Sequence, residues 1–170
     1  MKWMAIFLVA GMLTEASAQG GVQLVDKGGH VTEATIVFDA PPAEVYRVAT
    51  DYQHWPQILS DVSSVEVHGN RVRFHSRTFG QTVTVEFNNT PNRVIRFRGV
   101  EGPPGGRSSG SYVLTPVDGG ARTRVTVQLY AEVVGVGHVL YRESKMREIR
   151  REKLARDLTD TARYLASHRK

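Results

Sequence analysis

Cysteine is absent from the 170-residue chain, which excludes disulfides, thiolate metal sites and a cysteine nucleophile. The six histidines show neither HxxxH nor HxH spacing, and no carboxylate stands where it would complete a zinc triad with them. The spacing of the polar residues therefore assigns no catalytic residue and no metal ligand. We expect neither a metal ion nor another cofactor.

Long hydrophobic runs are also lacking, and the run that opens the chain, Trp3 to Leu13, is too short to cross a bilayer. Lys2 precedes it, and Ala16-Ser17-Ala18 follows with the small-x-small pattern of a cleavage site. Residues 1–18 are therefore predicted to be a signal peptide, so that the mature protein begins at Gln19 and is exported to the periplasm or secreted. A buried N-terminal helix is the alternative.

Negative charge is in deficit only at the end of the chain. From His138 onward there are ten Lys and Arg residues against five Asp and Glu residues, whereas the preceding residues hold twelve of each. Such an excess suits transient contact with an anionic membrane, although Lys and Arg also line ordinary solvated helix faces. The residues predicted to make this contact are Arg142, Lys145, Arg147, Arg150 and Arg151.

Glycine and proline are missing from residues 138–170, and the composition of this stretch favours a helix throughout. Apolar residues recur in it mostly at steps of three and four, which places them on one face. This stripe consists of Met146, Ile149, Leu154, Leu158, Ala162 and Leu165. A stripe of this kind needs an apolar surface to cover it.

The residues before the helix supply that surface as seven strands in which apolar and polar residues alternate. The first is Val31–Phe38, and two short helices follow it, the first of which begins at Pro42. Short turns separate the later strands, which favours antiparallel neighbours. These strands span residues 62–68, 71–79, 82–88, 93–99, 109–116 and 122–131. The prediction is a lead-in at 19–29 and one α+β domain at 30–170, a curved seven-stranded antiparallel sheet wrapped around the C-terminal helix.

Two other patterns bear on function. The segment from Gly99 to Gly110 is rich in Gly and Pro and has no periodicity, which predicts a flexible hairpin loop, either a movable cover for a cavity or a plain mobile loop. Arginines alternate with other polar residues on the outer face of the predicted sheet. A solvated sheet face has this composition, so nucleic-acid binding is not predicted.

Four motifs carry a family resemblance. They are Phe38-Asp39-Ala40-Pro41-Pro42-Ala43-Glu44-Val45-Tyr46, Asp51-Tyr52-Gln53-His54-Trp55-Pro56, Gly110-Ser111-Tyr112-Val113-Leu114-Thr115-Pro116 and Thr123-Arg124-Val125-Thr126. With the order of the elements, they resemble the helix-grip fold of the START and polyketide cyclase/dehydrase (SRPBCC) superfamily, which includes coenzyme-Q-binding proteins. The resemblance covers about residues 30–168. It implies the fold, but the superfamily contains carriers, cyclases, hydrolase-like enzymes and toxins.

One long helix cannot fill the concave face of a curved sheet, so we expect an apolar cavity between them. The residues predicted to contact a ligand there are Tyr52, His54, Trp55, Phe74, Ser76, Val85, Phe87, Phe97, Tyr112, Leu114 and Val127. Two of them have a structural alternative. Trp55 can be a packing corner, and a slip of one residue in register would turn Ser76 outward.

These features favour an exported carrier, expected to be a monomer, that holds a lipid, an isoprenoid quinone or a polyketide-like compound. One alternative is an enzyme of the cyclase or dehydratase kind that uses the same cavity, with His54 or Tyr112 as acid or base. Another is a domain that only docks on a protein or a membrane. A buried ionisable side chain at the cavity would favour the enzyme, and a purely apolar wall would favour the carrier.

Overall fold

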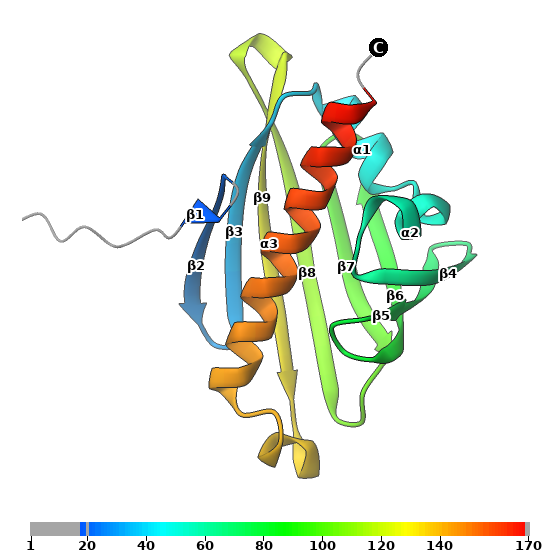
Figure 1. Cartoon of the computed structure of the whole chain (residues 1–170), viewed down its shortest axis with the longest axis vertical. Helices are drawn as coiled ribbons and strands as arrows, with labels where there is room; N and C mark the ends of the chain where they lie inside the picture. Colours follow the sequence, from blue (N-terminus) through cyan, green and yellow to red (C-terminus); the bar gives the residue numbers. More distant parts are fainter. Residues whose placement is uncertain (1–17, 20, 169–170) are drawn as a thin grey trace, which may run out of the picture.

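One antiparallel sheet curves around a single long helix that lies across its concave face (Figure 1). The computed structural model describes residues 18–19 and 21–168, so the predicted signal peptide lies, apart from Ala18, outside the described residues. In this part of the chain nine strands follow the order β1-β2-β3-β9-β8-β7-β6-β5-β4. The strands are β1 (Ala18–Gln19), β2 (Val22–Gly28), β3 (Val31–Phe38), β4 (Val62–His68), β5 (Arg71–Ser76), β6 (Gln81–Thr90), β7 (Val94–Glu101), β8 (Gly106–Val117) and β9 (Arg122–Val133).

Two short helices connect β3 to β4. They are α1 (Pro42–Ala49) and α2 (Trp55–Ile58), with a 3-10 turn, η1 (Tyr52–His54), between them. Proline lies in the first turn of each helix, where its missing N–H would have had no partner in any case. This connection leads the chain from β3, the third strand from one edge of the sheet, to β4 at the opposite edge (Figure 1).

The apolar stripe of the C-terminal helix α3 (Glu143–Ser167) faces the sheet, as the sequence predicts. Its members Met146, Ile149, Leu154, Leu158 and Leu165 are buried, and α3 packs against β2, β3 and β9. Each such side chain contributes about 1.5–3 kcal/mol when it is fully buried, so the stripe is enough to hold α3 on the sheet. Among the described residues, no helix is both long and apolar enough to span a bilayer.

The helix-grip architecture is confirmed, but the predicted seven strands are too few. Part of the lead-in at 19–29 joins the sheet, because β2 pairs with β3 and buries Val22 and Leu24. Its other residues are mostly polar and are exposed, so their pattern gave no strand signal. At the other end of the chain, α3 begins at Glu143 rather than near His138. A 3-10 turn, η3 (Gly135–Val139), precedes α3 and includes His138.

Most of the predicted hairpin loop at 99–110 is strand. β7 continues to Glu101 and β8 starts at Gly106, which leaves a short turn between them. Gly110 lies opposite Phe97 in this hairpin, and a Cβ on it would lie 2.6 Å from the Phe97 ring and closer still to the backbone oxygen of Gln128. Glycine is therefore needed at this position to let the Phe97 ring lie directly against β8.

Candidate ligand-binding cavity

A cavity of about 210 Å³ lies between the inward face of the sheet and α3. The inward residues of β5 to β9, parts of α1 and α2, and one face of α3 form its wall, and half of the lining residues are Val, Ile, Leu or Phe. Gly102, Pro103 and Gly106 of the β7–β8 turn border it as well. At roughly 30 Å³ for each molecule of liquid water, the volume equals about seven waters. It therefore fits a small organic molecule.

Aromatic side chains line one part of this wall. Trp55 meets Phe74 edge to face with ring centroids 5.5 Å apart, and Phe97 lies between Phe87 and Tyr112 at 6.4 and 6.1 Å. Trp55 is also fixed by packing, because its Nε1–H donates to the Ala49 carbonyl at 3.2 Å. The predicted contacts that line the cavity are Trp55, Phe74, Val85, Phe87, Phe97 and Tyr112. Their contact with a ligand remains a prediction.

Two predicted contacts from the corner before α2 lie outside the cavity wall. The Tyr52 hydroxyl accepts a hydrogen bond from the Asn89 amide at 2.8 Å, and the Tyr52 ring stacks on Phe87 from outside the cavity lining. His54 is more than half exposed and its Nδ1 lies 2.7 Å from Asp51. Tyr52 is thus partly buried beside the cavity wall, whereas His54 lies at the surface and cannot act as an acid or base inside the cavity.

Three further predicted contacts are buried away from the cavity. Ser76 points inward as predicted, but its hydroxyl donates to Asp61 at 2.8 Å. Leu114 and Val127 belong to the apolar core that α3 and α1 cover. Alternation along a strand predicts which residues point inward, but not which inward residues reach the cavity, because helices cover part of the inner face.

A polar strip on α3 interrupts the apolar wall. Arg150, Lys153 and Asp157 all line the cavity, and their steps of three and four residues place them on one side of the helix. The wall therefore contains buried ionisable groups, the feature that sequence analysis names as favouring an enzyme.

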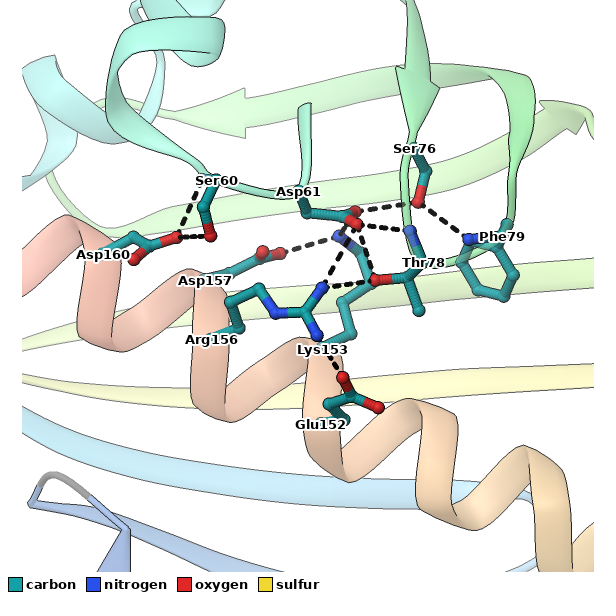
Figure 2. A network of polar contacts seen from close by, with 10 residues as sticks. All are labelled: Ser60, Asp61, Ser76, Thr78, Phe79, Glu152, Lys153, Arg156, Asp157 and Asp160. Atoms are coloured by element: carbon teal, nitrogen blue, oxygen red, sulfur yellow. Dashed lines mark hydrogen bonds and ion pairs between the residues drawn. The ribbon is translucent and has the colours of Figure 1, made fainter. Parts of the chain in front are cut away.

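Lys153 and Asp157 belong to a network centred on Asp61, shown in Figure 2. Asp61, which immediately precedes β4, is completely buried. Its carboxylate accepts hydrogen bonds from Ser76 at 2.8 Å, from the Thr78 hydroxyl at 2.6 Å, from the Thr78 N–H at 2.8 Å and from Lys153 Nζ at 3.1 Å. Arg156 lies 3.6 Å from the same carboxylate. Because both oxygens of Asp61 have several partners, this carboxylate ties α3 to the loops beside β4 and β5.

The charges in this network fix its protonation. Burial alone would raise the pKa of Asp61, but the charge of Lys153 and the hydrogen bonds from Thr78 and Ser76 hold it well below its usual range. Burial alone would lower the pKa of Lys153, yet the charges of Asp157 and Asp61 raise it above its ordinary value. Lys153 is therefore a cation at neutral pH and is not available as a base.

Asp157 differs from Asp61. Its Oδ2 accepts a hydrogen bond from Lys153 at 2.8 Å, while its Oδ1 is buried without a hydrogen-bond partner in the described part of the chain. Burial raises the pKa of Asp157, and the charge of Lys153 only partly opposes this. Burial and the charge of Asp157 also raise the pKa of Tyr112, so the Tyr112 hydroxyl keeps its proton. Of the three charged α3 side chains at the wall, Asp157 is thus the one with a buried oxygen free to accept a hydrogen bond.

Arg150 lies in a second buried cluster, which corrects one of the predicted membrane contacts. The residue is only 2% exposed. Its guanidinium donates to the Ala131 carbonyl at 2.8 Å, to Thr32 at 3.1 Å and to Glu143 at 2.5 Å. A side chain held in this way cannot reach a membrane, because it would have to leave these partners and the core.

The other predicted membrane contacts remain at the surface. Arg142, Lys145 and Arg147 are exposed, although Lys145 donates to Glu148 at 3.0 Å. Arg151 is only partly exposed and lies 3.1 Å from Asp26. The free basic surface of α3 is therefore smaller than its sequence suggests.

The sequence Gly106–Gly110 also has the Gly-x-Ser-x-Gly pattern, with Ser108 at the cavity wall. In hydrolases this pattern occupies a sharp turn from a strand into a helix, whereas here it lies within β8. Ser108 is therefore not presented as a nucleophile. In the described residues no three His, Asp or Glu side chains are grouped so that they could hold a metal ion.

The fold and the cavity define a helix-grip protein with an internal cavity between sheet and helix. The family model described as polyketide cyclase / dehydrase and lipid transport matches residues 29–166, and the chain belongs to this family. This confirms the superfamily that the motifs resemble. No curated protein matches the chain.

Solved structures agree with this fold. A protein of Thermus thermophilus is 26% identical, with 82% of this chain and 99% of the other covered and a TM-score of 0.64. A START superfamily protein of Mycobacterium smegmatis is 19% identical, with coverage of 81% and 99% and a TM-score of 0.64. The Zhui aromatase/cyclase of Streptomyces sp. R1128 is 21% identical, with coverage of 84% and 90% and a TM-score of 0.61. At these identities the last two show a shared fold.

The polar strip and Asp61 were missed by sequence reasoning. Lys153, Asp157 and Arg150 sit among many charged residues of a helix that looks solvated, and Asp61 follows a short helix without any motif. The sequence did contain one indication of this strip. Arg150 and Asp157 are seven residues apart, about two helical turns, and therefore lie on the same side of the helix, next to the apolar stripe. A charged residue on the edge of an apolar stripe is a candidate for burial with a partner.

Proposed function

We propose that the protein is a carrier that binds an apolar, ring-bearing small molecule in the cavity between the sheet and α3. The composition of the wall carries this proposal, since aromatic rings form one part and aliphatic side chains most of the remainder. An apolar ligand gains about 25 cal/mol for each Å² of its surface removed from water. The cavity volume favours a quinone ring or an aromatic polyketide fragment over a whole lipid. Membership of a family described by polyketide cyclisation and lipid transport supports this class of ligand.

Native mass spectrometry of the protein purified from its own host tests this proposal. We expect a bound species with the mass of a small apolar molecule, lost in the variant Ala131→Leu, which adds a larger side chain to the cavity wall. Ala43→Leu makes the same chemical change outside the cavity wall, in the first turn of α1, and should retain the ligand. A wild-type protein without any bound species, or retention in the Ala131 variant, would contradict the proposal.

Asp157 favours a second candidate function, an enzyme of the cyclase or dehydratase kind. A buried carboxyl group with a raised pKa and a free oxygen suits proton transfer in a cavity. The carrier fits better because the raised pKa values of Lys153 and Tyr112 make both groups weak acids and leave neither available as a base. Incubation with a linear poly-β-keto thioester distinguishes the enzyme from the carrier. An enzyme would release cyclic products formed with loss of water, whereas a carrier would return the compound unchanged.

We also propose that the carrier is exported and meets anionic membranes at the end of the molecule where α3 begins. The segment between β9 and α3 lies at the lower end of the molecule in Figure 1. It exposes large apolar side chains beside basic ones. The apolar residues are Val136, Val139 and Leu140, and the basic residues are Arg142, Lys145 and Arg147. Basic residues at an anionic surface contribute about 1 kcal/mol each. Both Val133 before this segment and Met146 after it border the cavity, so docking here would bring the membrane close to the ligand.

Co-sedimentation with vesicles of phosphatidylcholine, with and without phosphatidylserine, tests the membrane contact. Binding should require the anionic lipid and should be lost at high salt, because the Debye length falls to about 3 Å at 1 M. Arg147→Glu should weaken it, while Arg124→Glu, the same change on the exposed face of β9, should not. Binding that ignores lipid charge and salt would refute the contact. Export is tested separately by N-terminal sequencing, which should give Gln19.

A further inference from the structure

One oxygen atom at the cavity wall has no use within the fold. Asp157 lines the cavity and is 7% exposed, and its Oδ1 is buried without a hydrogen-bond partner among the described residues. Leaving a buried polar atom unsatisfied costs about 1–3 kcal/mol, and more when the group is charged. An atom in this state requires a partner that the chain itself does not supply.

The neighbouring polar groups are satisfied in other ways. Asp160, one turn from Asp157, accepts hydrogen bonds from the Ser60 N–H at 2.8 Å and the Ser60 hydroxyl at 2.6 Å. Thr161 also borders the cavity, but its hydroxyl donates to the backbone carbonyl of Asp157 at 2.8 Å. Two buried side-chain oxygens of the described residues lack a partner, Asn89 Oδ1 and Asp157 Oδ1, and only Asp157 belongs to the cavity wall.

We infer that Asp157 Oδ1 is the polar anchor of the bound ligand and that the ligand carries a hydroxyl group, as an alcohol or a phenol. This inference rests on the proposed binding of an apolar molecule and adds its polar end. The O–H of such a group donates to Oδ1, while its carbon skeleton contacts the apolar wall. An anionic head group is disfavoured, because Lys153 already lies between two carboxylates at 2.8 and 3.1 Å and has no charge to spare.

A hydroxyl group satisfies Asp157 in either protonation state. When the carboxyl is ionised, the ligand O–H donates to Oδ1; when Oδ1 carries a proton, it donates to a lone pair of the ligand oxygen. A methyl group of the same size can do neither. The hydroxyl therefore distinguishes the inferred ligand from a purely apolar one, whatever the pH of the measurement.

The test compares 4-butylphenol with 4-butyltoluene, which replaces the hydroxyl by a methyl group of similar size. Titration of the full-length protein is followed by tryptophan fluorescence, with excitation beyond the absorption of the phenol; of the two tryptophans, Trp55 lines the cavity and reports binding. The ratio of the two dissociation constants is measured in the wild type and in Asp157→Leu. Because the ratio cancels the intrinsic hydrophobicity of the ligands, its change between the proteins isolates the hydrogen bond.

We expect the preference for the phenol to fall by about tenfold to a hundredfold in Asp157→Leu, the range for a hydrogen bond to a charged group. Glu148→Gln removes an exposed carboxylate from the same helix, away from the cavity, and should leave the ratio unchanged. If the leucine variant does not fold, Asp157→Asn should still lower the preference severalfold, since an amide is a weaker acceptor than a carboxylate.

An unchanged ratio would overturn the inference and leave the proposed binding intact, because both probes would still enter the cavity. It would mean that the ligand does not reach Oδ1. Failure of both probes to bind the wild-type protein would instead count against the cavity as a ligand site and remove the inference with it. The two failures are therefore distinguishable.

Discussion

Lys153 Nζ lies between two carboxylates in very different surroundings (Figure 2). At one end Asp61 is enclosed by loops and accepts hydrogen bonds from Ser76, Thr78 and Lys153. At the other end the Asp157 carboxylate is held by Lys153 and presents its second oxygen without a partner in the described chain. The pKa of Asp61 is lowered and the pKa of Asp157 is raised, although both carboxylates contact the same ammonium group.

This difference separates structural stabilisation from capacity for binding. A carboxylate whose oxygens both accept hydrogen bonds from the protein holds two parts of the fold together and cannot accept another from a ligand. A carboxylate left short of partners at a cavity wall destabilises the free protein slightly and is ready to accept a donor. We therefore assign Asp61 to stability and Asp157 to ligand binding. The following predictions test this assignment, from the largest expected effect to the smallest.

Asp61→Ala should lower the free energy of unfolding by about 3–5 kcal/mol, as removal of one partner from a buried ion pair typically does. The change leaves the Ser76 hydroxyl and the Thr78 N–H without acceptors in a buried site. Urea denaturation measures the effect. Glu152→Ala removes the exposed partner of Arg156 and should cost less than about 1 kcal/mol. A loss of similar size in both variants would remove the structural role assigned to Asp61.

Trp55→Ala tests whether the aromatic part of the cavity wall serves stability, as assigned to Asp61, or ligand binding, as assigned to Asp157. The ring packs on Phe74 and donates to the Ala49 carbonyl, so we expect a loss of about 3 kcal/mol in stability. Ligand retention should fall too, because the ring lines the cavity. Denaturation midpoints and retention are to be measured on the same samples. A stable variant that has only lost its ligand would show that Trp55 serves binding alone.

The two carboxylates should respond to pH with opposite sign. The lowered pKa of Asp61 gives stability that is present above its ordinary value of 3.8 and is lost as the pH falls further. The raised pKa of Asp157 gives a contribution that is present below 3.8 and is lost as the pH rises. Each group changes the slope by at most about 1.4 kcal/mol per pH unit.

Urea denaturation of the wild type and two variants over a range of pH measures these slopes. Asp61→Asn should lose less stability than the wild type on acidification below about pH 4. Asp157→Asn should gain stability relative to the wild type as the pH rises above about 4. Parallel curves for the three proteins would show that neither carboxylate titrates as its surroundings indicate.

Asp157→Leu should change the free energy of unfolding by less than about 1 kcal/mol. The variant loses an ion pair with Lys153, but it also removes a buried oxygen without a partner in the described chain, and Lys153 keeps Asp61. Urea denaturation beside Asp61→Ala makes the comparison direct, since both variants remove one negative charge from the same network. A loss as large as that of Asp61→Ala would make Asp157 a structural residue.

Sequence reasoning succeeded where local periodicity carries the information. The burial of Ala34, Ile36 and Phe38 on β3 follows their alternation, and the burial of Leu154 and Leu158 on α3 follows their helical spacing. The same alternation brought Phe74, Val85 and Phe97 to the cavity wall. It failed for His54, because a 3-10 turn of three residues is too short for a repeating pattern to indicate side-chain direction. It failed for β2, because the alternation of buried residues there ends after Val22 and Leu24.

The sequence alone determined the order of the elements, the antiparallel sheet, the long terminal helix and the apolar character of the space between them. These features depend on residues close together in the chain, whose spacing decides the face on which each side chain lies. Tertiary structure alone decided that Lys153 meets Asp61, which is 92 residues away, that Arg150 is buried against Ala131, and that Asp157 Oδ1 meets no partner in the described chain. A charged side chain is exposed or buried according to the partners that distant segments bring to it, and no local pattern records those partners.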